Sequence, residues 1–283
     1  MPEGPEIRLA ADKIEGALKG RKLSEVFFAF EHLKPFSESL VGSTVIGLET
    51  RGKALLTHTD QGLSIYSHNQ LYGRWMVRKA GQVPATNRQL RLALHNSQQS
   101  AFLFSASDIE VLETADLLLH PFLARLGPDI LSAPKSEIEM QVQDERFARR
   151  RLGNLLLDQG FLAGMGNYLR SEALFFSRID PSARPANCSI DELKHLATII
   201  CSLARQSYQH GGITNDLALA AELKSQGQKK QEYRHWVFAR EGKACHRCGD
   251  KIRKISVSTR RLYFCPSCQK VKLLGERQRL KTR

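Results

Sequence analysis

The sequence predicts a multidomain α+β protein: an N-terminal helix joined to an antiparallel β-sandwich, then a helical domain, then a small C-terminal finger. Three observations predict this order. Apolar residues recur at helical spacing near the start, short β-rich runs fill residues 22–105, and four cysteines form two tight pairs near the end. A chain of 283 residues is long enough for more than one compact unit. The predicted domains span residues 1–128, 129–232, 233–270 and a basic tail, 271–283.

The N-terminal domain begins with a predicted helix from Glu6 to Leu18. Its apolar residues are spaced by four, three and four positions, which places them on one helical face: Ile7, Ala11, Ile14 and Leu18. The following runs alternate polar and apolar residues or are rich in β-formers, with Gly, Asn and Asp between them. The clearest runs cover residues 43–48, 53–57, 90–94 and 101–104. This pattern indicates an antiparallel sandwich.

The pattern becomes helical after Gly127-Pro128-Asp129. Apolar spacing predicts four helices, over residues 138–148, 152–159, 168–176 and 190–208. Residues 211–232 are polar and contain three glycines, which predicts a mobile loop.

The cysteine pairs have the spacing C-x₂-C-x₁₆-C-x₂-C, at Cys245, Cys248, Cys265 and Cys268. This spacing is typical of a zinc site with four thiolate ligands. We expect one structural Zn²⁺, because four thiolates leave no position open for a substrate. The remaining cysteines, Cys188 and Cys201, stand apart, which favours a reducing compartment.

No apolar run is long enough for a membrane span, and the first residues lack the layout of a signal peptide. We therefore expect a cytoplasmic protein.

The formal net charge of +13 is concentrated at one end of the chain. Residues 229–283 contain 17 Lys and Arg against 4 Asp and Glu, whereas the preceding residues balance to zero. Such a block is an electrostatic footprint for phosphates. The alternative is a solvated basic tail with no ligand.

The chain starts Met1-Pro2-Glu3-Gly4-Pro5. Removal of Met1 would expose Pro2 as a secondary amine, and an α-amino group has a pKa of about 7.7–8.0. A neutral amine of this kind attacks an aldehyde or the anomeric carbon of a sugar and forms an iminium ion. Glu3 lies beside it as a proton donor or acceptor. The alternative is purely structural, because proline and acidic residues both suit the first turn of a helix.

Two further basic residues are candidates for chemistry or phosphate binding. Lys53 follows Gly52 at a predicted strand start, and Arg260 lies where two strands between the cysteine pairs meet. An arginine at such a tip donates two parallel hydrogen bonds to phosphate. For Lys53 the alternative is a solvated lysine at a strand edge.

Two loops carry candidate nucleic-acid contacts. The stretch Gly164-Met165-Gly166-Asn167 precedes a predicted helix, whose first N–H groups suit an anion. It could equally be an ordinary helix corner. Leu71 and Tyr72 follow Gln70 in a polar loop, where apolar side chains can wedge between bases. Alternatively, both belong to the core of the next strand.

Taken together, these motifs resemble the bacterial DNA glycosylase/lyases of the formamidopyrimidine-DNA glycosylase/endonuclease VIII family. The resemblance covers nearly the whole chain and lies in residues 2–6, 51–53, 127–129, 164–168 and the four cysteines. Residues 51–58, 66–73 and 105–110 are similar to the endonuclease VIII branch rather than the oxidised-purine branch.

The resemblance implies a role for each candidate. Pro2 attacks C1′ of a damaged nucleotide flipped from double-stranded DNA, and Glu3 assists sugar-ring opening and protonation. Lys53 donates a proton in β-elimination, and Arg260 serves δ-elimination and grips phosphate. The helices around Asn167 form a helix–two-turns–helix element. The implied DNA contacts are Gln70, Leu71, Tyr72, Arg125 and Asn167.

The implied activity is removal of oxidised pyrimidines in base excision repair, followed by β,δ-elimination, by a monomer acting on nucleoid DNA. An oxidised-purine glycosylase is one alternative, since residues 211–236 begin Gly-Gly-Ile-Thr as in that branch. A non-catalytic zinc protein that binds DNA is another. The roles of residues 211–236 and of the tail stay unassigned.

Overall fold

The computed structural model describes residues 2–270 and divides into two compact units, with the boundary after Leu126. Each unit has its own apolar core. Among the described residues, no helix is long and apolar enough to cross a membrane. The predicted basic tail, 271–283, lies outside the described residues.

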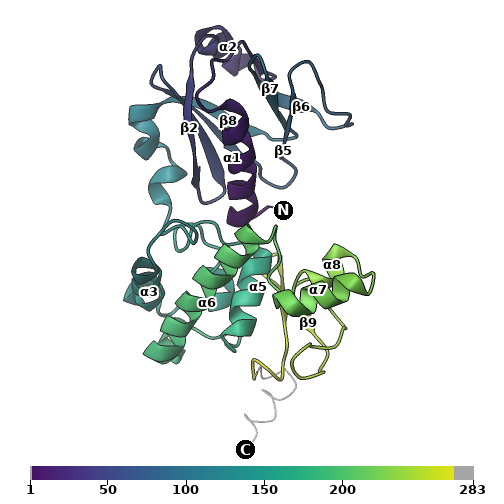
Figure 1. Cartoon of the computed structure of the whole chain (residues 1–283). Helices are drawn as coiled ribbons and strands as arrows, with labels where there is room; N and C mark the ends of the chain where they lie inside the picture. Colours follow the sequence, from purple (N-terminus) through teal and green to yellow (C-terminus); the bar gives the residue numbers. More distant parts are fainter. Residues whose placement is uncertain (1, 271–283) are drawn as a thin grey trace, which may run out of the picture. The chain divides into compact units, whose positions relative to one another are not determined.

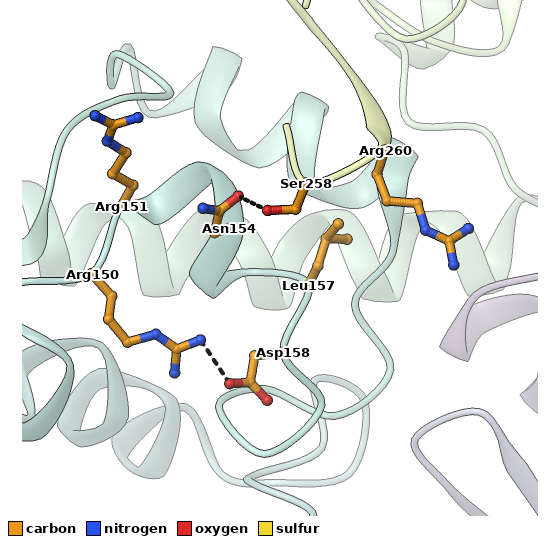
Figure 2. A pocket seen from close by; sticks show the side chains of 7 residues that line it. All are labelled: Arg150, Arg151, Asn154, Leu157, Asp158, Ser258 and Arg260. Carbon is orange, nitrogen blue, oxygen red and sulfur yellow. Dashed lines mark hydrogen bonds and ion pairs between the residues drawn. The ribbon is translucent and has the colours of Figure 1, made fainter. Parts of the chain in front are cut away.

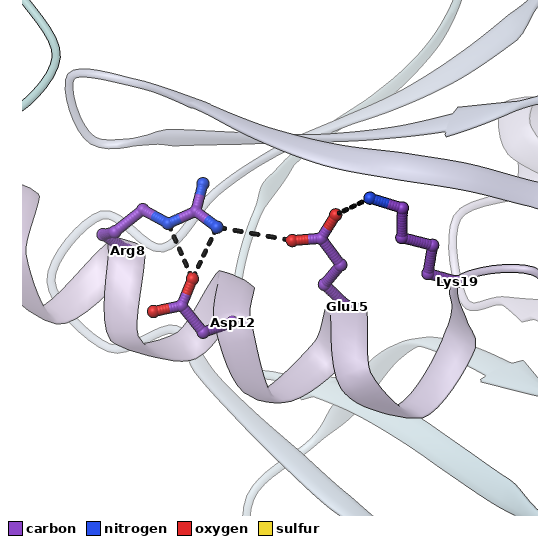
Figure 3. A network of polar contacts seen from close by, with 4 residues as sticks. All are labelled: Arg8, Asp12, Glu15 and Lys19. Carbon is purple, nitrogen blue, oxygen red and sulfur yellow. Dashed lines mark hydrogen bonds and ion pairs between the residues drawn. The ribbon is translucent and has the colours of Figure 1, made fainter.

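The first unit opens with helix α1 (Gly4–Leu18), as the apolar spacing predicted. Pro5 lies in its first turn, and the backbone amide of Glu3 donates to Glu6 Oε2 at 3.0 Å as half of a capping box. The four apolar residues of the predicted face are buried. A row of ion pairs covers part of the solvent side of the helix, formed by Arg8, Asp12, Glu15 and Lys19 (Figure 3). Such half-exposed pairs each contribute little to stability.

Two four-stranded antiparallel sheets follow (Figure 1). The first has the order β2-β3-β4-β8, with strands β2 (Val45–Arg51), β3 (Ala54–Thr59), β4 (Leu63–His68) and β8 (Asp108–Glu113). The second has the order β1-β6-β7-β5, with strands β1 (Glu25–Phe28), β6 (Leu90–His95), β7 (Gln99–Phe104) and β5 (Arg74–Lys79). Shorter pieces complete the unit: α2 (Pro35–Leu40) and 3₁₀ turns at Glu31–Leu33, Thr114–Leu119 and Leu123–Arg125.

Helix α1 packs against strands of both sheets, and all three share one core. The first sheet contributes residues such as Leu55 and Ile65, the second Leu94 and Leu103, and α1 contributes Ile14. The predicted helix plus antiparallel sandwich is therefore confirmed. Because α1 lies in this core, its amino end has a fixed position within the unit.

The helical part of the second unit has four main helices around a shared core. They are α3 (Lys135–Gln143), α4 (Leu152–Leu155), α5 (Asn167–Phe176) and α6 (Ile190–Gln209), with 3₁₀ turns at Glu145–Phe147 and Pro185–Asn187. Helix α4 is shorter than the predicted 152–159. After Leu155 the amides of Leu157 and Asp158 donate three residues back, to the carbonyls of Asn154 and Leu155, and Asp158 Oδ1 then accepts the Gly160 amide at 2.9 Å, so the chain continues in turns.

The predicted mobile loop at 211–232 is wrong. The segment contains helices α7 (Leu217–Ser225) and α8 (Lys230–Tyr233). Asp216 caps α7 by accepting the Leu219 amide at 2.9 Å, and the Thr214 amide donates to the Arg234 carbonyl at 2.9 Å. Gly211 and Gly212 precede α7, and Gly227 lies between the two helices, so these glycines mark turns around helices rather than a structureless stretch.

The finger contains a two-stranded hairpin, β9 (Arg253–Val257) and β10 (Arg260–Phe264). Ser258 and Thr259 join the strands with φ values of 47° and 64°, as expected for the tight turn that matches strand twist. Leu262 and Phe264 of β10 are buried in the helical core. The strands therefore meet beside Arg260, as predicted.

We predict that Ile14→Ala lowers the free energy of unfolding by about 2–5 kcal/mol, because it opens a cavity where α1 meets both sheets. Ile14 is 0% exposed. Urea denaturation measures the change. The neighbouring Lys13→Ala, at an exposed position, is the control and should change stability little. Equal effects of the two substitutions would contradict the shared core.

Candidate functional site

Pro2 and Glu3 lead directly into α1 in the first unit. The side chain of Glu3 is only 2% exposed, although it is charged and lies near the start of the chain. Its backbone is extended, with φ −111°, and the capping box holds it against Glu6. The carboxyl group of Glu3 therefore sits in a fixed, largely water-excluded position directly after the proline.

Lys53 lies in the two-residue turn between β2 and β3, where Gly52 adopts a φ of +61°. Its positive charge acts on His68, which is at the end of the neighbouring strand β4. Burial lowers the pKa of His68, the charge of Asp108 raises it, and Lys53 lowers it further. Lys53, His68 and Asp108 thus share one end of the first sheet.

The loop after His68 is at the same end of that sheet. The Gln70 amide donates to His68 Nδ1 at 3.0 Å, and Ser107 Oγ donates to Gln70 Oε1 at 2.7 Å. Leu71 and Tyr72 are 50% and 67% exposed. The alternative that they form the core of the next strand is wrong, because β5 starts only at Arg74.

Arg125 closes the last 3₁₀ turn of the first unit, and its guanidinium lies 5.5 Å from the ring centroid of Phe122. The charge of Arg125 also acts on the hydroxyl of Tyr66. The pKa of Tyr66 is nevertheless raised, first by burial and then by Asp108 and Glu110. Arg125 is therefore an exposed cation beside the outer face of the first sheet.

The other candidates belong to the second unit. Asn167 is the first residue of α5, after Gly166. Its Oδ1 accepts from Arg170 Nη2 at 3.2 Å, and the same nitrogen donates to the carbonyl of Arg261 at 2.9 Å. Arg170 therefore links Asn167 to the strand that starts at Arg260.

Arg260 lines a basic pocket of about 520 Å³ (Figure 2). Ser258 Oγ donates to Asn154 Oδ1 at 3.2 Å, which fastens the hairpin tip to α4. Arg150 is paired with Asp158 at 2.9 Å. The other lining residues are Arg151 and Leu157. With three arginines and one carboxylate, the pocket favours an anion.

The four cysteine sulfurs lie within 4.8 Å of one another. Two separations are 3.9 Å, between Cys245 and Cys268, and 3.4 Å, between Cys248 and Cys265. Tetrahedral Zn²⁺ with Zn–S bonds of about 2.3 Å brings its sulfurs to about 3.8 Å from each other. The thiolates therefore fit one structural zinc ion, which would brace the hairpin.

Sequence reasoning missed Arg170 and Glu172, both fully buried in α5. Glu172 accepts hydrogen bonds from the backbone amides of Trp236, Val237 and Phe238 at 2.9–3.0 Å. Burial raises the pKa of its carboxyl group, and these bonds oppose that shift. The sequence did contain a signal for these two residues, because an arginine and a glutamate lie close together within an otherwise apolar helical segment.

Comparisons with known proteins agree with this architecture. Three family models match: the formamidopyrimidine-DNA glycosylase N-terminal domain at residues 1–105, its H2TH domain at 126–218, and a zinc finger found in FPG and IleRS at 242–271. Endonuclease 8 of Salmonella arizonae is 46% identical over 272 residues, covering 95% of this chain and 100% of that protein. Endonuclease 8 of an Enterobacter species is 45% identical over the same length.

Solved structures show the same fold. The Lactococcus lactis formamidopyrimidine-DNA glycosylase bound to DNA with an N7-benzyl-Fapy-dG matches with a TM-score of 0.79 at 21% identity, covering 95% of this chain and 100% of that one. Its complex with abasic-site DNA matches with a TM-score of 0.78. A helix-led β-sandwich, an H2TH helical domain and a four-cysteine finger define this class of protein. The chain belongs to the formamidopyrimidine-DNA glycosylase/endonuclease VIII family, and it has one structural zinc site.

We predict one zinc per chain, lost in Cys268→Ser but retained in Cys188→Ser, because Cys188 lies outside the cluster. Loss of zinc should loosen the hairpin, since a finger of this size depends on its metal for folding. Metal analysis and hydrogen exchange of residues 245–268 provide the measurements. Full protection of the hairpin without zinc would contradict a structural role.

Proposed function

We propose that this chain is a base-excision-repair enzyme of the endonuclease VIII type, a bifunctional DNA glycosylase and abasic-site lyase that removes oxidised pyrimidines. The observation that carries the proposal is the 46% identity to an Endonuclease 8 over that protein's whole length. The residue arrangement supports it, because each chemical requirement has a candidate group.

The proposed nucleophile is Pro2 after removal of Met1. Its secondary amine attacks C1′ of the damaged nucleotide, the bond from C1′ to the base breaks, and an iminium ion joins protein and sugar. Glu3 is placed beside it in a site that excludes water. A carboxyl group held there assists opening of the sugar ring and transfers the proton that opening requires.

Strand cleavage follows from the iminium ion, which withdraws electrons from the sugar. β-Elimination removes a proton from C2′ to solvent as the C3′–O bond breaks and the 3′ phosphate leaves, and we assign the proton donor of this step to Lys53. δ-Elimination then removes a proton from C4′ as the C5′–O bond breaks and the 5′ phosphate leaves, and we assign it to Arg260, whose guanidinium also holds phosphate. Cations at rigid turns suit these tasks: Lys53 is half-buried in the turn after Gly52, and Arg260 is exposed directly after the turn at Ser258 and Thr259.

The remaining candidates hold the distorted DNA. Leu71 and Tyr72, with Gln70, fill the gap that the flipped nucleotide leaves in the duplex. Arg125 and Asn167 also contact the DNA. Fixed loop geometry and the exposed apolar side chains support this assignment.

We assign Pro2, Glu3 and Lys53 to a catalytic domain at 1–128, which also carries DNA contacts such as Leu71. The helical domain at 129–232 binds DNA, and the zinc finger at 233–270 contributes Arg260. The enzyme acts as a monomer on double-stranded DNA of the nucleoid, in the cytoplasm. Cysteines that bind zinc instead of forming disulfides suit that reducing compartment.

The iminium ion is directly testable. Borohydride should trap the wild-type protein covalently on an abasic oligonucleotide, because it reduces the iminium to a stable amine. A form with an uncleaved extension before Pro2 should give no adduct, since its proline nitrogen is an amide. Gel electrophoresis and intact mass measure both. Equal trapping of the blocked form would disprove the role of Pro2.

An oxidised-purine glycosylase is the second candidate, because residues 211–236 begin Gly-Gly-Ile-Thr as in that branch. We predict faster single-turnover excision of thymine glycol than of 8-oxoguanine from otherwise identical duplexes. Faster excision of the purine would favour the second candidate. Trapping on abasic DNA should not distinguish the two, so it serves as the control for active protein.

A further inference from the structure

Arg170 is a buried arginine to which the proposed chemistry gives no task. It lies in α5 and is 0% exposed. Its Nη1 donates to the Gly153 carbonyl of α4 at 2.6 Å, and its Nη2 donates to the Arg261 carbonyl of β10 at 2.9 Å and to Asn167 Oδ1 at 3.2 Å. Because a guanidinium is planar and rigid, it holds these acceptors, which come from distant parts of the chain, at fixed separations.

Helix α5 holds β10 at a second point. Ser171 Oγ accepts from the Tyr263 amide at 3.2 Å, so two consecutive residues of the helix, Arg170 and Ser171, bond to β10. Leu262, between the two bonded positions, is 0% exposed and packs into the helical core. The strand therefore cannot slide along α5 without breaking these bonds and displacing Leu262. Arg260 directly precedes the first bonded position, so its backbone has a fixed place.

The turn before Arg260 is fastened separately. Ser258 Oγ donates to Asn154 Oδ1 at 3.2 Å (Figure 2). Asn154 follows Gly153, whose carbonyl accepts from Arg170, so both contacts reach the same part of α4. The hairpin tip is thus connected to α4 by a direct side-chain bond and also through the guanidinium of Arg170.

Arg170 also fixes the orientation of the Asn167 amide. An arginine has only N–H donors, so the atom of Asn167 that it contacts is the oxygen. The other end of the amide is then its NH₂ group, which suits a phosphate oxygen as a donor. One nitrogen of Arg170, Nη2, therefore holds both the amide of Asn167 and the strand that carries Arg260.

We propose that Arg170 is a positioning residue for strand cleavage: it sets the place of Arg260 relative to Asn167 and thereby favours δ-elimination. This inference rests on the proposed function, because it takes the roles of Arg260 and Asn167 from there. A misplacement of about 1 Å can cost about 100-fold in rate. The step that uses Arg260 therefore depends on Arg170, whereas the steps that use Pro2 and Lys53, in the other unit, do not.

The test is Arg170→Lys. A lysine keeps the positive charge, but a single ammonium nitrogen does not reproduce the fork that spans three acceptors. Single-turnover reactions at saturating protein use a duplex with one abasic site, labelled at the 5′ end of the cleaved strand. β-Elimination leaves an unsaturated sugar on the labelled fragment, whereas δ-elimination leaves a 3′ phosphate, so gel electrophoresis separates the two products.

We expect Arg170→Lys to lower the rate of δ-elimination by about tenfold or more, because Arg260 is no longer held in place. The rate of β-elimination should stay that of the wild type, so the fragment with the unsaturated sugar accumulates. An unchanged ratio of the two products would overturn the proposal. So would equal losses in both steps, which are what a purely structural role predicts.

Leu196→Ala is the matched control for stability. Leu196 is 0% exposed in α6 and belongs to the same core, and its truncation destabilises the unit through packing alone. The folded molecules should keep the wild-type product ratio, with zinc content and thermal melting as checks that each variant is folded. A shift in the ratio as large as that of Arg170→Lys would overturn the proposal, because lost stability would then explain it.

A measurement on the wild-type protein does not depend on how the variants fold. Hydrogen bonds at both Nη atoms slow the rotation and exchange of the Arg170 guanidinium protons. NMR of protein with nitrogen-labelled arginine should therefore resolve these protons, with cross-relaxation to Asn167. They should persist when a duplex with a stable abasic analogue binds, and their loss on binding would overturn the proposal.

Failure here is distinguishable from failure of the proposed function. Borohydride should trap wild type and Arg170→Lys equally on abasic DNA, since trapping needs the iminium ion and not δ-elimination. Absence of trapping in the wild type would refute the glycosylase/lyase assignment. Normal trapping with the same product ratio in both proteins would refute only the role of Arg170.

Discussion

The second unit depends on two opposite charges buried in one short helix. Arg170 and Glu172 of α5 are both fully buried, and burying a charge is costly unless hydrogen bonds replace its water. Arg170 meets this condition with the carbonyls of Gly153 and Arg261, at 2.6 and 2.9 Å, and with Asn167. Glu172 meets it with the amides of residues 236–238. One helix thereby fixes the α4 turn, the hairpin and the chain leading into the zinc site.

The two units reach rigidity by different means, and chain composition explains the difference. The first unit has enough apolar residues to bury α1 against both sheets, so packing positions this helix and the capping box fixes its first turn. The finger is too short for a core of its own. Leu262 and Phe264 of the finger instead pack into the core of the helical domain. The four thiolates, by binding zinc, hold the rest of the finger in place. In the proposed function Pro2 and Glu3 are thus positioned by the packing of α1, whereas Arg260 is positioned by zinc and by buried polar contacts.

Helix α1 and the zinc site could be predicted, because each depends on residues spaced at short intervals along one stretch of sequence. The four apolar positions of α1 and the cysteine pairs both repeat at intervals that a single stretch of sequence displays. The strand order β1-β6-β7-β5 could not be predicted in this way, because it pairs residues far apart in the chain. Nor could the contacts of Glu172 with residues 236–238, which depend on backbone amides that no residue type marks. Helices α7 and α8 were missed although Asn215-Asp216 is a helix-start signal, because the surrounding glycines dominated the prediction.

The loop that carries Leu71 and Tyr72 shows why exposed apolar residues can be stable in a rigid position. A Cβ on Gly73 would lie 2.5 Å from the Asn69 carbonyl oxygen, so only glycine permits this turn. Gln70 adopts a φ of 48° and is held by Ser107. The loop therefore holds a strained backbone, and keeps Leu71 and Tyr72 exposed to solvent, even when no ligand is bound. A wedge ordered in advance loses less conformational entropy on binding, so more of the energy of its apolar contacts remains to offset the unstacking of a base pair.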